Sequence, residues 1–204
     1  NNKKTLIIKK ESPPNSILIN EIMINPNDDK SEWVELINNS NEKVNLKNWQ
    51  LSDWLSSPKV SYISSSDYWL EPDDFLIVGN DSSILKFYPN LKERIKISSF
   101  GTLNNSADGV FLYNQSNHII DSVCYDNGWK TKKGVSIERI SRFSFSNDSS
   151  NWFLSQSPEG NTICSSNSVL SLRKYSPNSI VLNEIMYEAS MTSEYLEFLN
   201  VSPD

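Results

Sequence analysis

The chain has 204 residues, a formal net charge of −6 and a pI of about 4.9. The acidic balance disfavours non-specific binding to nucleic acid or to an anionic membrane surface, because both select for basic patches. We expect no membrane span, since no apolar run approaches the roughly 18 residues that a spanning helix needs.

Short runs rich in β-branched and aromatic residues alternate with clusters of Asn, Asp, Ser, Gly and Pro along the whole chain, which is typical of strands and turns. In chain order the pattern predicts strands at residues 6–10, 17–24, 33–38, 49–53, 60–63, 75–79, 109–113, 118–125 and 135–140. Only residues 82–92 show helical spacing, and Pro89 limits this helix to a turn or two. Many short strands with little helix indicate a β-sandwich.

Two segments of the chain carry the same motif. Residues 17–38 read ILINEIMINPNDDKSEWVELIN, and residues 180–200 read IVLNEIMYEASMTSEYLEFLN. Such a long period is typical of tandem domains, because solenoid repeats are usually about 20–50 residues long. We therefore expect an N-terminal strand or linker at 1–16, a complete β-sandwich at 17–163, a linker at 164–179, and the truncated start of a second domain at 180–204.

Eight pieces of the first copy follow one another in the order seen in a known family. They are NEIM at 20–23, EWVELIN at 32–38, VNLKNWQLSD at 44–53, LEP and FLIV within 70–78, LNNSADGV at 103–110, IDSV and Tyr125 within 120–125, SIER at 136–139, and NW and SPEGN within 151–161. Through them the chain resembles the lamin tail domain. Two positions depart from the family pattern: Asn48 stands where Gly is usual, and Glu159 interrupts a usual Pro-Gly pair.

The resemblance implies an immunoglobulin-like β-sandwich. The family occurs in nuclear intermediate filaments and as an accessory module of secreted and envelope proteins in bacteria and archaea. No heptad coiled coil precedes the domain here, so the tandem arrangement is similar to the prokaryotic kind. We accordingly expect an extracellular, cell-surface or envelope location and a non-catalytic role in spacing, adhesion or assembly, with a protein or other domains of the parent chain as partner.

Glu21 and Glu35 recur in the second copy as Glu184 and Glu197. If their strands are adjacent, the carboxylates can converge. One interpretation is a calcium site completed by Asp53 or by residues 28–29, because hard cations take several oxygen ligands. The favoured interpretation is structural: each glutamate pairs with Arg or Lys, or accepts backbone N–H groups. We therefore expect no cofactor. A pair between Glu138 and Arg139, or an orienting contact from Arg139 to Glu21 or Glu35, is a further hypothesis.

The six tryptophans fall into two groups. Trp33, Trp49 and Trp152 lie inside the motifs and are predicted to be core residues. Trp54, Trp69 and Trp129 lie near loops, where they could stack on sugar rings or anchor a protein partner. The alternative for these three residues is that they cap the ends of the sandwich.

Catalysis has little support in the sequence. His118 is the only histidine, and it borders a predicted hairpin loop without a Gly-x-Ser-x-Gly elbow. We expect no enzyme activity; a calcium- or carbohydrate-binding accessory module of an extracellular enzyme is the alternative to a spacer. Residues 180–200 lack the rest of their sheet, so we expect them, if ordered, to pair with an edge of the first domain or to form a strand-mediated dimer.

Overall fold

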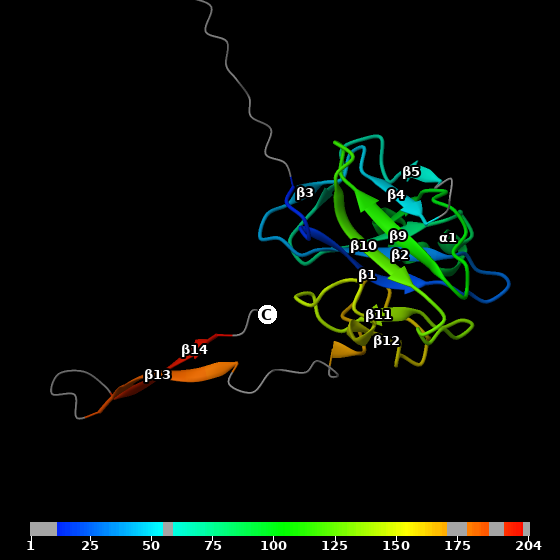
Figure 1. Cartoon of the computed structure of the whole chain (residues 1–204). Coiled ribbons are helices and arrows are strands. Elements are labelled where there is room, and N and C mark those ends of the chain that lie inside the picture. Colours follow the sequence, from blue (N-terminus) through cyan, green and yellow to red (C-terminus); the bar gives the residue numbers. More distant parts are fainter. Residues whose placement is uncertain (1–11, 55–58, 171–178, 188–193, 202–204) are drawn as a thin grey trace, which may run out of the picture. The chain divides into compact units, whose positions relative to one another are not determined.

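The computed structural model of the protein describes residues 12–54, 59–170, 179–187 and 194–201. The chain divides into two units, Asn1–Ser171 and Leu172–Asp204. The first unit is the predicted β-sandwich, and its two sheets are seen in Figure 1. The predicted strand at 6–10 lies outside the described residues.

One sheet of the sandwich has six strands in the order β12-β11-β1-β2-β7-β8. These are β12 (Trp152–Leu154), β11 (Ile137–Arg139), β1 (Ile17–Met23), β2 (Trp33–Asn38), β7 (Phe75–Gly79) and β8 (Ile95–Ile97). The other sheet has the order β10-β9-β4-β5, comprising β10 (Ile119–Tyr125), β9 (Asp108–Tyr113), β4 (Gln50–Asp53) and β5 (Val60–Tyr62). A small separate sheet pairs β3 (Val44–Asn45) with β6 (Trp69–Leu70).

The main core lies between the two large sheets. Val34 and Leu36 of β2 contribute to it, together with Leu51 and Leu112 of the opposite sheet and the fully buried Trp49. Trp152 also belongs to this core. Trp33 is buried too, but on the opposite face of β2.

That opposite face of the six-stranded sheet is also covered. A second cluster of Met23, Trp33, Ile77, Ile84 and Ile95 packs beneath α1 (Ile84–Phe87) and the 3₁₀ helix η1 (Pro89–Arg94). A second 3₁₀ helix, η2, spans Ser149–Asn151. Because both faces are covered, every residue of β1 and β2 is buried, the polar ones included.

An extra residue in β1 decides which side chains reach the core. The pairing of β1 with β2 shifts between Ile19 and Glu21, which is a β-bulge at Asn20. Ile19 and Ile22 therefore both lie in the main core, although strict alternation would send them to opposite faces. The bulge places Asn20 and Glu21 on the outer face.

The departure from the family pattern at position 48 has a conformational explanation. Asn48 has φ of 59°, in the left-handed region that glycine adopts without steric cost. Asparagine is among the few other residues that tolerate this conformation. The substitution therefore keeps the turn before Trp49 and adds an amide side chain to it.

The second unit contains β13 (Ile180–Met186) and β14 (Tyr195–Asn200), which pair with each other as an antiparallel hairpin. Within the described residues they form a two-stranded sheet of their own. The expected pairing with an edge of the first domain or with a second chain stays a prediction. Each strand has the other as its partner, just as β1 has β2.

The first part of the segment expected as a linker, 164–179, packs on the first unit. Asn167 and Val169 are buried in the first unit, whose boundary falls at Ser171. The Asn167 side chain donates to the main-chain carbonyl of Arg139, and the backbone N–H groups of Ser168 and Val169 donate to Glu138. Residues 171–178 of the expected linker lie outside the described residues.

Candidate functional site

Three glutamates lie side by side on the outer face of the six-stranded sheet. Glu21 on β1 is opposite Glu35 on β2 and opposite Glu138 on β11. All three side chains are fully buried. The predicted convergence of Glu21 and Glu35 is therefore confirmed, and Glu138 joins them from the SIER motif.

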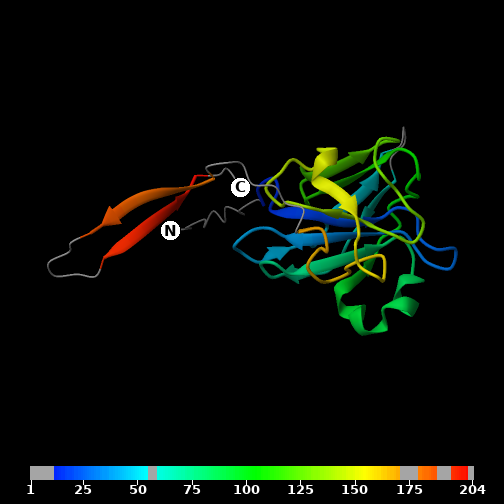
Figure 2. The same ribbon diagram turned by 90° about the horizontal axis from the view of Figure 1, so that it is seen from below.

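Residues 155–170, which we name the strap, cover this carboxylate cluster (Figure 2). The backbone N–H of Thr162 donates to Glu21 at 3.0 Å, and that of Cys164 donates to Glu35 at 2.6 Å. Glu138 accepts the N–H groups of Ser168 at 2.7 Å and Val169 at 3.2 Å. The carboxylates thus satisfy buried backbone donors of a segment that makes few ladder hydrogen bonds of its own.

Two asparagines complete the attachment of the strap. Asn20, the bulge residue, donates from Nδ2 to Glu35 and to Asn167 Oδ1, both at 2.8 Å. Asn167 in turn donates to the main-chain carbonyl of Arg139 at 2.8 Å. The sequence did not indicate a role for Asn167, because a lone Asn in a Ser-rich segment carries no periodic signal.

Burial raises the pKa of two glutamates of this cluster, Glu21 and Glu35. It raises the pKa of Glu21 to about 7, against the hydrogen bonds from Ser136 and Thr162 that lower it. Burial also raises the pKa of Glu35 well above its usual range, and the neighbouring Glu21 raises it further. Desolvation and like charges both disfavour the ionised form, so Glu21 and Glu35 hold their protons to higher pH than exposed glutamates do.

The hydroxyl of Thr162 lies between the carboxyl groups of Glu21 and Glu138. Its Oγ1 lies 3.0 Å from Glu21 Oε2 and 3.1 Å from Glu138 Oε1. A hydroxyl has one proton to donate, so both contacts are hydrogen bonds only if one carboxyl is protonated. A proton on Glu21, whose pKa is raised, gives a chain from Glu21 through Thr162 to Glu138. The cluster therefore fixes the strap to the sheet through hydrogen bonds.

The calcium hypothesis finds only part of its ligand set in one place. Asp53 lies on β4 in the other sheet, where its Oδ1 accepts the N–H of Lys59 at 2.9 Å. Asp28, proposed as a further ligand, pairs with Lys133 at the surface. Among the described residues, no group of three His, Cys, Asp or Glu side chains is arranged to hold a metal ion.

Arg139 does not contact the carboxylate cluster, contrary to the hypothesis from sequence. Adjacent residues of a strand point to opposite faces, so Glu138 and Arg139 cannot pair. Arg139 instead donates to Asp121 at 3.0 Å and to the carbonyl of Ile19 at 2.7 Å, and its guanidinium lies 4.8 Å from the Trp152 ring centroid. Both charged groups are buried, and burial lowers the pKa of Arg139 while it raises that of Asp121, against the lowering effect of Arg139.

The three loop tryptophans differ in their surroundings. Trp54 and Trp69 are 60% and 54% exposed, so both are available for contacts. Trp129 is half-buried against the main core, between Tyr125 and Trp152 at centroid distances of 6.4 and 6.0 Å. Trp129 therefore caps one part of the core, while an interaction role for Trp54 and Trp69 stays a prediction.

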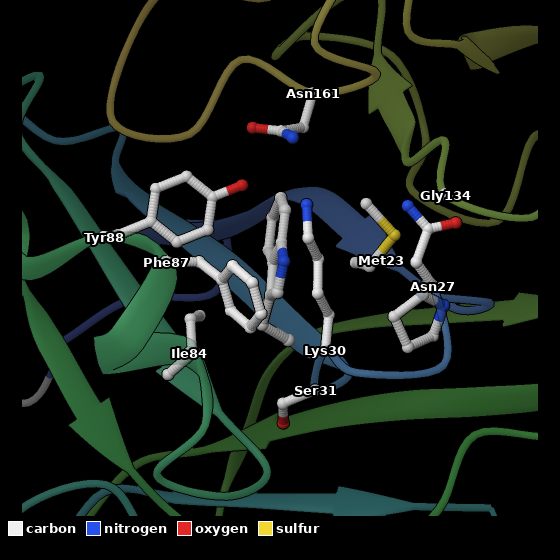
Figure 3. A pocket seen from close by; sticks show the side chains of 11 residues that line it. Met23, Asn27, Lys30, Ser31, Ile84, Phe87, Tyr88, Gly134 and Asn161 are labelled. Atoms are coloured by element: carbon white, nitrogen blue, oxygen red, sulfur yellow. The ribbon is translucent and has the colours of Figure 1, made fainter.

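A small hollow lies beside the second hydrophobic cluster. Figure 3 shows the side chains of Lys30 and Phe87 next to each other, with Tyr88 and Asn161 above them. The hollow among them has a volume of about 10 Å³, and Lys30 Nζ lies 5.0 Å from the Phe87 ring centroid. This space is about that of a single water molecule, so it admits no larger ligand.

These features define a class of protein, an immunoglobulin-like β-sandwich of two facing sheets. Its buried carboxylates accept hydrogen bonds from the strap of the same chain. Residues 10–127, more than half of the chain, match the Lamin Tail Domain family, and the protein belongs to this family. The family is non-catalytic. No curated protein resembles the chain closely enough to count as a match. The sandwich continues beyond the matched residues, since β11, β12 and the strap complete it.

In the described part of the chain, no helix has the length and apolarity needed to cross a membrane.

Proposed function

We propose that this chain is a non-catalytic structural and protein-interaction module, of spacer or adhesion type, in which lamin tail domains are repeated in tandem. The observation that carries the proposal is the pairing of the two hairpins. Six pairs of β13 with β14 reproduce the six pairs of β1 with β2, from Ile180 opposite Asn200 to Met186 opposite Tyr195.

The local chemistry of the two hairpins agrees as well. The pairing of β13 with β14 shifts between Leu182 and Glu184, so Asn183 takes the place of the bulge residue Asn20. Asn183 donates to Glu197 as Asn20 donates to Glu35. A one-residue bulge with the same asparagine–glutamate contact is more specific than strand propensity, and it supports a second copy of the domain beginning at residue 180.

A hairpin exchange tests this equivalence. In one variant, residues 180–200 replace residues 17–38 of the first domain. We expect cooperative unfolding at a stability lowered by about 1–3 kcal/mol, because Leu196 and Phe198 are larger than the core residues that they replace. The matched control is the same exchange with Asn183 deleted. The deletion removes the bulge and shifts the core-facing side chains to the other face, so this chimera should not fold. If both chimeras fold, or neither does, the equivalence is refuted.

A secreted or cell-envelope parent protein is part of the proposal. Its support is the repeated motif at residues 180–200, together with the acidic charge. Labelling of intact source cells with a membrane-impermeant reagent checks it, since an envelope or surface protein is modified and an internal one is not.

Self-association through the second hairpin is the proposed contact between chains. Both β13 and β14 have one edge without a partner strand among the described residues, and such edges favour pairing with another chain. Sedimentation over a range of concentrations should show a dimer, which a proline in place of Leu182 should abolish. A monomer at every concentration contradicts this contact.

A further inference from the structure

A groove of about 850 Å³ lies along the small sheet of β3 and β6. We propose that this groove binds a neutral glycan chain, with a pyranose ring stacked on Trp69. The volume is within the range of ligand pockets, which is about 300–1,000 Å³. The inference does not depend on the spacer role, because every residue that it uses belongs to the first domain.

Trp69 provides the apolar surface of the groove. Its side chain is more than half exposed although it belongs to a strand, and Lys43 Nζ lies over the ring, 5.3 Å from the centroid. The indole has a second face that a flat apolar surface can cover. Pyranose rings with equatorial hydroxyls present such a surface, since their C–H groups point above and below the ring.

The wall beside Trp69 is held in place by its own hydrogen bonds. Asn45 donates from Nδ2 to Asp67 at 2.9 Å, while its Oδ1 accepts the N–H groups of Lys47 and Tyr68, both at 3.1 Å. Lys47 Nζ also lies 3.3 Å from Asp67. A wall fixed before binding costs little conformational entropy on binding, which favours recognition of a weakly interacting ligand such as a sugar.

Two polar side chains are placed to contact hydroxyl groups. Gln115 accepts a hydrogen bond from Trp49 Nε1 at 2.9 Å, so its Nε2 is the group that it can offer to a ligand. Asn48 is exposed and lines the groove from its left-handed turn.

The charges in the groove favour a neutral ligand. The lining contains two carboxylates, Glu42 and Asp67, and two ammonium groups, Lys43 and Lys47, and the remaining polar lining consists of amides and hydroxyls. A polyanion or polycation would meet as many repulsive as attractive groups. Amides, hydroxyls and one aromatic face match instead the alternating C–H and O–H surface of a neutral sugar.

Affinity electrophoresis tests the proposal on the intact chain. Native gels contain one soluble polysaccharide each: hydroxyethylcellulose, mixed-linkage β-glucan, arabinoxylan or galactomannan, with heparin as the anionic comparison. We expect at least one neutral polysaccharide to retard the protein. The association constant should be the same at low and at high salt. Retardation by none of the four, or by heparin alone, overturns the proposal.

Three variants show whether the retardation comes from this groove. Trp69→Ala should abolish it, and Asn48→Gly should weaken binding about 2–10-fold, the loss of one hydrogen bond. Asn48→Gly keeps the left-handed turn, so loss of binding cannot be attributed to unfolding. Trp54→Ala removes an equally exposed tryptophan outside the groove and should bind as the parent chain does. Equal effects of Trp54→Ala and Trp69→Ala contradict the assignment.

Discussion

The two hairpins of this protein have nearly the same sequence and the same pairing but opposite surroundings. Every residue of β1 and β2 is buried, whereas Leu196 and Phe198 of β14 are exposed, as is Glu197 beside them. The hairpin conformation therefore depends on local sequence, the bulge included. The burial of its apolar and acidic side chains depends on the other strands and the strap. This separation between local conformation and burial is open to experiment at matched positions.

The largest difference is expected at Leu36 and its counterpart Phe198. Leu36 lies in the main core, so Leu36→Ala should lower the free energy of unfolding of the first domain by about 2–5 kcal/mol. Phe198→Ala should change it by less than about 0.5 kcal/mol, because the side chain is exposed. Denaturant unfolding followed by tryptophan fluorescence measures both. Equal losses would show that the second hairpin is part of the first core.

Glu21 and Glu184 should differ in their effect on the pH dependence of stability. The pKa of Glu21 is raised to about 7 in the folded protein, so folding favours the protonated form. Its contribution is complete below the usual pKa of 4.5 and is lost as pH rises towards 7 and above. Glu21→Gln should thus reduce the fall in stability between pH 5 and pH 8 by up to about 3 kcal/mol.

Unfolding curves at several pH values supply this measurement, with Glu184→Gln as the matched control. The control should leave the profile unchanged, since Glu184 lies on the exposed hairpin. If Glu21→Gln shows the same pH dependence of stability as the parent chain, the pKa of Glu21 does not change on folding.

The next effect concerns the bulge asparagines. Asn20→Ala leaves Glu35 Oε1 and Asn167 Oδ1 without their donor, at a cost of about 1–3 kcal/mol to the first domain. Asn183→Ala breaks the corresponding contact with Glu197 in an exposed setting, where water replaces it. Thermal unfolding should show a clear decrease for the first variant and none for the second. A comparable decrease in both would place the second hairpin inside a packed structure.

The smallest effect is expected from calcium. The oxygens of Glu21 and Glu35 accept N–H groups of the strap, and Asp53 lies in the other sheet. Millimolar calcium followed by chelator should therefore leave the melting midpoint of the chain unchanged, because only ligands that bind the native state raise it. A reversible rise in the melting midpoint that is absent in Glu35→Gln would support the calcium hypothesis instead.

The sequence predicted the sandwich and most of its long strands, because alternation and turn residues are local signals. β3, β6, β8 and β12 were missed; each has only two or three residues, which gives little periodic signal. The convergence of Glu21 and Glu35 followed from the repeated motif. The sequence did not indicate that residues 164–170 of the strap pack on the sheet, because their hydrogen-bond partners lie far away in the sequence. Arg139 was misassigned because its side chain faces the core, where Asp121 from β10 meets it.

The strap also has a consequence for synthesis of the protein. Glu21 and Thr162, which it joins, are 141 residues apart in the chain. At translation rates of about 5–20 residues per second, the first strand waits on the order of 10 s for the segment that covers its glutamate. During that interval the acidic face of the nascent sheet stays open to water or to a chaperone. The strap therefore closes the domain that the first strand begins.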